Sequence, residues 1–121
     1  MYRARPDGEG SFQAPEPLPE PINSEGRDDG AWVSPDGQTM LITYADRGGC
    51  GGGDLFIAYR RDGEWIEPVN LGCDINSPYG ELAATLIPGT RTLVFPSTRP
   101  MPGAPPETIA LWSVELPESI E

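Results

Sequence analysis

The chain has 121 residues, with 19 acidic and 8 basic side chains and a formal net charge of −11. A surface this acidic repels phosphate backbones and anionic lipid, so we expect neither nucleic acid nor a membrane surface as a partner. Histidine is absent from the sequence, which excludes Ser-His-Asp and Cys-His catalysis and histidine-ligated zinc.

Glycine and proline interrupt the whole chain. Each occurs 15 times, and the longest stretches free of both are the ten-residue segments 38–47 and 107–116. Neither is long enough for a membrane-spanning helix, so we expect no membrane insertion, and even one ordinary helix would be cramped. The first ten residues lack an apolar segment, so we expect no signal peptide in this chain.

Short apolar runs rich in β-forming residues alternate with turn signals such as Pro-Asp-Gly and Arg-Asp-Gly. This alternation predicts an all-β fold with many turns. Two runs, Leu41-Ile42 and Leu93-Val94-Phe95, place apolar residues consecutively, which is typical of strands buried on both faces. In chain order, the predicted strands are Ala31–Ser34, Thr39–Tyr44, Leu55–Tyr59, Glu64–Ile66, Ala83–Ile87, Thr92–Phe95 and Thr108–Val114.

An internal repeat organises the chain. A shift of 53 residues aligns Ile22-Asn23-Ser24 with Ile75-Asn76-Ser77, and a partial third copy precedes them, since Tyr2–Gly8 reads like Tyr59–Gly63. Each unit has four short strands in roughly 50 residues, the pattern of one blade of a β-propeller. We therefore expect about two four-stranded antiparallel blades. Their boundaries are the end of a preceding blade with a connection over 1–30, one blade over 31–82 and a second, degenerate blade over 83–121.

A family resemblance rests on motifs between Val33 and Glu81. They are a Ser-Pro-Asp-Gly turn, Arg47 at the end of the second strand, a Gly-Gly loop and Asp54-Leu55-Phe56, followed by Trp-x-x-Pro-x-x-Leu-Gly and Ile-Asn-Ser-Pro. With these motifs the segment resembles the WD-like propeller repeat of TolB-type proteins. The second copy departs from the pattern, with Ile-Pro-Gly-Thr at its hairpin and Pro100–Pro106 where the Gly-Gly loop would be.

The resemblance implies a propeller of four to eight blades, a protein partner and a periplasmic or otherwise extracytoplasmic location. Because we expect no signal peptide here, a cytoplasmic location stays open. Two blades do not close a ring, since their sheet edges and inner faces stay exposed. Three arrangements follow: a piece of a longer propeller, copies that associate (three would give six blades), or a unit that docks on another protein.

The candidate ligand-binding residues are Asp46, Arg47, Asp54 and Tyr79. The first three flank the glycine-rich loop 48–53, where they would form a pocket at the mouth of a propeller. We favour a structural alternative, in which a charge-assisted bond between Asp54 and Arg47 closes this hairpin. The loop matches no phosphate-binding motif and leads into a strand, so it predicts no phosphate site. Tyr79 follows Asn-Ser-Pro in a loop, whereas most other aromatic residues occupy predicted strands.

We expect no cofactor and no metal site. Cys50 and Cys73 are too few for an all-cysteine zinc site, and the sequence has no Asp-x-Asp-x-Asp-Gly calcium loop. Both cysteines lie beside glycine in loop-like segments, which permits a disulfide without requiring one.

The function we predict is a non-catalytic binding or scaffold module, in which rigid sheets present loops to a partner protein. The alternative is a carbohydrate-binding or glycoside-hydrolase-type propeller. In that case tryptophan or tyrosine rings would stack on sugars, and a carboxylate pair would cleave the glycosidic bond. Because the second unit is degenerate, a decayed fragment without activity of its own is a third interpretation.

Overall fold

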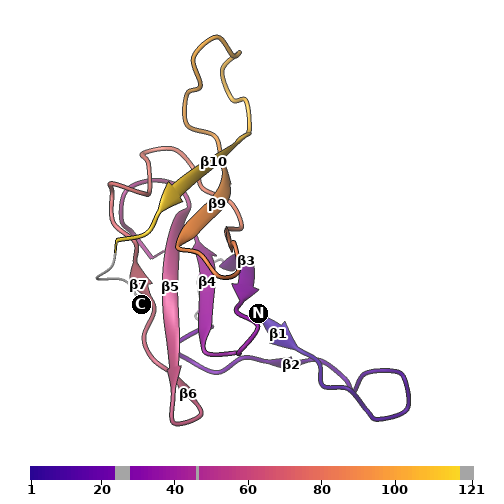
Figure 1. The fold of residues 1–121 in the computed structure, drawn as a ribbon. Coiled ribbons are helices and arrows are strands. Elements are labelled where there is room, and N and C mark those ends of the chain that lie inside the picture. The colour runs from indigo at the N-terminus through magenta and orange to yellow at the C-terminus, as the bar shows by residue number, and fades with distance from the viewer. Residues whose placement is uncertain (24–27, 46, 118–121) are drawn as a thin grey trace.

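The computed structural model describes residues 1–23, 28–45 and 47–117. Within these ranges the chain forms strands and turns and no helix, which confirms the expected all-β class (Figure 1). The described residues accordingly contain no helix that could cross a membrane. The strands are β1 (Tyr2–Arg3), β2 (Glu16–Pro17), β3 (Asp28–Val33), β4 (Thr39–Tyr44), β5 (Asp54–Arg61), β6 (Glu64–Trp65), β7 (Val69–Asn70), β8 (Thr85–Leu86), β9 (Thr92–Ser97) and β10 (Ala110–Glu115).

The central sheet is built on the antiparallel strands β3, β4 and β5, in that order. β6 pairs with the C-terminal end of β5 and β7 pairs with its middle, on the edge of β5 that β4 leaves free. Segment 64–70 therefore acts as one interrupted outer strand, and Pro68, which has no N–H to donate to the ladder, lies in the interruption. The strand predicted over Glu64–Ile66 is the first part of this longer element.

A second sheet contains β8, β9 and β10, with β9 in the middle. β9 and β10 pair antiparallel over six residues, so these two strands form its main hairpin. The outer edge of β10 pairs with no strand in the described part of the chain. A third, two-stranded sheet pairs β1 with β2 and projects to the side in Figure 1. Between residues 1 and 117, as far as the structure describes them, the sheets do not close into a ring.

One face of the central sheet packs against the N-terminal segment. Ile22, which is fully buried, lies in a cluster with Ile42 and Phe56 of the sheet, and Leu18 and Met1 pack on its border. Burial of these side chains removes apolar surface from water and attaches residues 1–23 to the sheet. The buried members of this cluster are Ile22, Met40, Ile42, Tyr44, Phe56 and Ala58.

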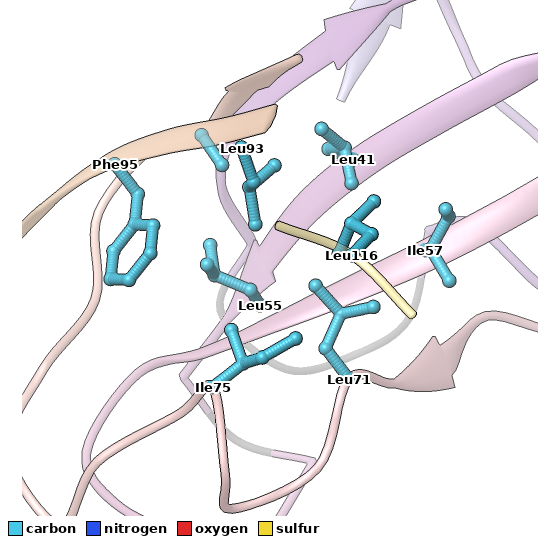
Figure 2. Close-up of a cluster of buried hydrophobic side chains, with 9 residues drawn as sticks. Leu41, Leu55, Ile57, Leu71, Ile75, Leu93, Phe95 and Leu116 are labelled. Carbon is cyan, nitrogen blue, oxygen red and sulfur yellow. The ribbon is translucent and has the colours of Figure 1, made fainter. Parts of the chain in front are cut away.

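The opposite face of the central sheet packs against the second sheet. Figure 2 shows Leu93 of β9 lying beside Leu41 and Leu55, which come from β4 and β5. Successive side chains of a strand point to opposite faces, so β4 contributes Leu41 to this cluster and Ile42 to the other. The predicted burial of β4 on both faces is confirmed. The buried members are Leu41, Leu55, Ile57, Leu71, Ile75, Ala84, Leu93, Phe95 and Leu116.

The same prediction is wrong for β9. Its side chains alternate, with Leu93 and Phe95 buried and Val94 only half-buried. The physical reason is that only one face of the second sheet meets another layer within the described residues. The outer face of this sheet therefore remains in contact with solvent.

Cys50 and Cys73 form a disulfide, with their Cα atoms 5.6 Å apart. The bond joins the glycine-rich loop 48–53 to the turn that follows β7. The sequence left this pairing open, and the structure shows that the two loops are covalently connected.

Candidate functional site

Asp54, the first residue of β5, organises the glycine-rich loop. Its carboxylate accepts hydrogen bonds from the backbone N–H groups of Cys50 at 2.6 Å and Gly51 at 3.1 Å, and from Nδ2 of Asn70 at 3.0 Å. Only 1% of Asp54 is exposed. Gly49 allows this approach, because its φ is +129° and a Cβ atom there would lie 2.0 Å from the carboxylate. The Asp54 oxygens therefore hold the loop.

Arg47 has a different set of partners. Its Nη2 donates to the carbonyl oxygens of Pro21 at 2.8 Å and Ile22 at 3.0 Å, and Nη1 lies 3.6 Å from the Glu67 carboxylate. The guanidinium carbon lies 3.7 Å from the centre of the Tyr44 ring. The predicted bond between Asp54 and Arg47 is therefore wrong, because loop amides take up the Asp54 oxygens while Arg47 ties the segment before β3 to the sheet.

The other two candidate residues lie in different places. Asp46 lies outside the described residues. Tyr79 lies in the predicted loop and is 49% exposed, and its backbone oxygen accepts a hydrogen bond from Gly52 at 3.1 Å. Its side chain lines a separate cavity, so Arg47, Asp54 and Tyr79 do not form one pocket.

Apart from Tyr79, the residues that line that cavity belong to loop 98–109, which joins β9 to β10 and extends beyond the sheets in Figure 1. Its volume is about 670 Å³. Four prolines lie between 100 and 106, and each fixes its own φ near −65°, which limits the conformations of the loop. Its lining includes Tyr79, Thr98, Arg99, Met101, Pro105 and Thr108.

Arg99, at the base of this cavity, belongs to a buried polar network. Its Nη2 donates to the carbonyl oxygen of Ile75 at 2.6 Å and lies 3.3 Å from the Glu81 carboxylate. Glu81 is 1% exposed and accepts further hydrogen bonds from the Ser77 hydroxyl at 2.6 Å and the Ser97 hydroxyl at 2.8 Å. Such a network is stable because every buried oxygen has a donor.

The network repeats part of the arrangement around Arg47. Arg47 donates to the carbonyl of Ile22, and Arg99 donates to the carbonyl of Ile75, the residue that aligns with Ile22 in the repeat. The asparagines that follow these isoleucines form hydrogen bonds with backbone groups more than 20 residues away, Asn23 with Met1 and Asn76 with Leu55. Asn76 accepts a hydrogen bond from the Leu55 N–H at 2.7 Å and donates one to the Leu55 carbonyl oxygen at 3.1 Å.

Sequence reasoning missed the part played by Glu81. It was one acidic residue among 19, and the structure shows that it is buried beside Ser97. A signal was present, because Glu81 follows Asn-Ser-Pro-Tyr-Gly inside the repeated motif. Spacing alone does not distinguish a buried carboxylate from an exposed one.

The carboxylates near the cavity bear on the glycoside-hydrolase alternative. Among the described residues that line the cavity, the one carboxylate is that of Glu107, whereas a glycosidase mechanism uses a pair. The buried carboxylates of Asp54 and Glu81 are already hydrogen-bonded within the fold. In the described part of the chain no three acidic or cysteine side chains gather where they could hold a metal ion.

No family model matches the chain, and neither a curated protein nor a solved structure matches it. The resemblance to TolB-type repeats therefore stays a prediction.

Proposed function

We propose that the chain is a non-catalytic scaffold, a partial TolB-like propeller of about two blades, that binds a partner protein. The observation that carries this proposal is an exposed apolar patch on and beside β10. Ile109 is 60% exposed and Leu111 is 74% exposed, and both adjoin the edge of β10 that has no paired strand in the described chain. An exposed apolar patch beside an open sheet edge is a typical protein-binding surface.

The stacked sheets support the propeller part of the proposal. In each unit an arginine after the second strand donates to an isoleucine carbonyl of the preceding connection, as Arg47 and Arg99 do. The central sheet has an outer strand on β5, which gives it the four-stranded arrangement of a blade. A scaffold of this kind holds its loops and edges in fixed positions for a partner.

We also propose an extracytoplasmic location. The disulfide between Cys50 and Cys73 supports it, because such bonds persist in oxidising compartments and are rare in the cytosol.

The test is retention of a partner on the immobilised chain. Leu111→Asp places a charge in the patch, and Ile66→Asp makes the same change at another exposed apolar residue, which is 47% exposed. We expect an extract of the source cells to yield a protein that the wild type and Ile66→Asp retain and Leu111→Asp loses. Retention of nothing beyond bare resin would overturn the proposal.

A second candidate function is carbohydrate binding, which the position of Tyr79 in the cavity lined by loop 98–109 favours. A half-exposed tyrosine can stack on a sugar ring. A glycan array tests it, with Tyr79→Ala as the variant and Tyr2→Ala, at a residue 70% exposed and far along the chain, as the matched control. Sugar binding lost in the first variant alone would support this candidate, and an array without hits would remove it.

A further inference from the structure

The central sheet has an outer segment that has no counterpart on the second sheet among the described residues. Segment 64–70 covers the outer edge of β5, where Asn70 pairs with Phe56 and Val69 with Ile57. The backbone N–H of Leu71 then donates to the carbonyl oxygen of Leu55 at 3.0 Å. The equivalent edge in the second sheet belongs to β10.

The register of the two sheets identifies the equivalent residues. Ile42 pairs with Phe56 in the central sheet, and Phe95, which aligns with Ile42 in the repeat, pairs with Trp112 in the second sheet. Trp112 is therefore the counterpart of Phe56. By the same register Leu111 corresponds to Leu55 and Ser113 to Ile57.

The hydrogen-bond direction of β10 follows from one contact. The backbone N–H of Leu116 donates to the backbone carbonyl oxygen of Arg91 at 2.8 Å, on the side of β9. Backbone groups alternate between the two edges of an antiparallel strand, so the N–H and C=O groups of Leu111, Ser113 and Glu115 point to the open edge. Leu111 therefore presents its carbonyl in the same way that Leu55 presents its carbonyl to Leu71.

Side chains beside this edge indicate what kind of strand would fit. In the central sheet the outer segment places the Glu67 carboxylate 3.6 Å from Arg47. In the second sheet Arg99 is the counterpart of Arg47 and keeps 22% of its side chain exposed. Its guanidinium carbon lies 5.4 Å from the ring centre of Trp112, whose buried Nε1 has no hydrogen-bond partner among the described residues. A carboxylate placed beside Arg99 as Glu67 is placed beside Arg47 could accept a hydrogen bond from its guanidinium.

We propose that the partner protein adds an extended segment antiparallel to β10, in the position that 64–70 occupies on β5, and places an acidic side chain beside Arg99. This inference rests on the proposed function and names its site and the chemistry of the partner. The segment would carry an aromatic residue, an acid and a proline at the spacing of Trp65, Glu67 and Pro68. Strand addition of this kind takes its affinity from main-chain bonds and its specificity from such side chains.

The probe is a synthetic peptide with the sequence of residues 63–72, titrated into the intact isotope-labelled chain and followed by backbone amide NMR. We expect shifts concentrated at 110–116 and at the Arg99 side chain. A peptide methylated on the backbone nitrogen of Leu71 loses the bond to the Leu111 carbonyl, and we expect it to bind about tenfold more weakly. Methylation at Asn70, whose N–H points away from β10 by the same alternation, is the matched control.

A second peptide carries Glu67→Gln, and we expect weaker binding together with loss of the Arg99 shift. On the protein side, Ser113→Pro removes an outward N–H, while Ser113→Ala keeps it. Shifts at β5 in place of β10, equal binding of both methylated peptides, or no binding at millimolar peptide would overturn the inference. The peptide variants decide the matter even if Ser113→Pro fails to fold.

The inference and the proposed function fail in different ways. If the immobilised chain retains a partner equally well with Ser113→Pro and Ser113→Ala, the function stands and the strand-addition site is wrong. If the chain retains no partner at all, the function itself is wrong. A solution mass of twice 13.0 kDa that Ser113→Pro returns to 13.0 kDa would replace the partner with a second copy.

Discussion

At the scale of single residues, the carboxylates that could carry chemistry instead hold the fold together. Asp54 fastens a loop to β5, and Glu81 joins the segment before β8 to β9 through Ser97. Both side chains are buried, so their oxygens depend on protein donors in place of water. We therefore expect the loss of either carboxylate to lower the free energy of unfolding.

Glu81→Gln tests this. The change leaves Arg99 near an uncharged amide and puts an N–H₂ group where the Ser77 and Ser97 hydroxyls donate. We expect the free energy of unfolding to fall by about 3 kcal/mol, the range for breaking a buried ion pair. Urea unfolding measures it, with Glu64→Gln at an exposed position as control. An unchanged midpoint would mean that the network does not stabilise the fold.

A pH prediction concerns Asp36 in the Ser-Pro-Asp-Gly turn. A hydrogen bond from the Ser34 hydroxyl, at 2.5 Å, and one from the Gln38 N–H hold the pKa of Asp36 below its ordinary value. A folded-state pKa below the unfolded one adds stability above about pH 4, and that stability is lost as the pH falls through the folded value. We expect Ser34→Ala to raise the pKa of Asp36 toward its ordinary value, as NMR titration of the carboxyl carbon would show. Ser113→Ala should leave it unchanged.

At the scale of elements, local signals predicted seven of the ten described strands, and β1, β2 and β7 were not predicted. Thr39–Tyr44 was predicted with both boundaries correct, because apolar and β-branched residues lie between a Pro-Asp-Gly turn and a glycine loop. The pairing of β6 and β7 with one edge of β5 was not predicted, since it depends on residues brought together by the whole sheet. The same holds for the candidate site. The loop position of Tyr79 was predicted from Asn-Ser-Pro, whereas the partners of Arg47 and Asp54 come from segments that the sequence does not bring together.

The glycine-rich loop offers a matched pair of substitutions. A Cβ at Gly51 would lie 2.3 Å from the Tyr79 backbone oxygen and 2.4 Å from that of Ser77, whereas a Cβ at Gly52 meets nothing within 4 Å. We expect Gly51→Ala to lower the free energy of unfolding by about 1–3 kcal/mol through overpacking. Gly52→Ala should change it by less than about 0.5 kcal/mol. Thermal unfolding of the two variants makes the comparison, and equal stabilities would mean that the two loops are not in contact.

At the scale of the whole molecule, the central sheet lies between the N-terminal segment and the second sheet. The face of the second sheet that points away from the central sheet is its outer face. That face of the second sheet corresponds, by the repeat and the strand register, to a face of the central sheet that is packed against a neighbour. In chain order, Thr85, Val94, Leu111 and Ser113 stand where the central sheet has Trp32, Leu41, Leu55 and Ile57. Three of these four residues are smaller or more polar than their counterparts, which makes this face a poorer match for another layer, whereas Leu111 is unchanged and is 74% exposed.

This substitution pattern predicts the assembly state. A ring of three copies would need the outer face to pack on another copy, and Thr85 and Ser113 offer little apolar area for that contact. We therefore expect light scattering after size exclusion to give a mass of 13.0 kDa. The double variant Thr85→Trp, Ser113→Ile restores the residues of the central sheet and should associate at the same concentration. A wild-type mass near three times 13.0 kDa would instead mean that the copies close a propeller among themselves.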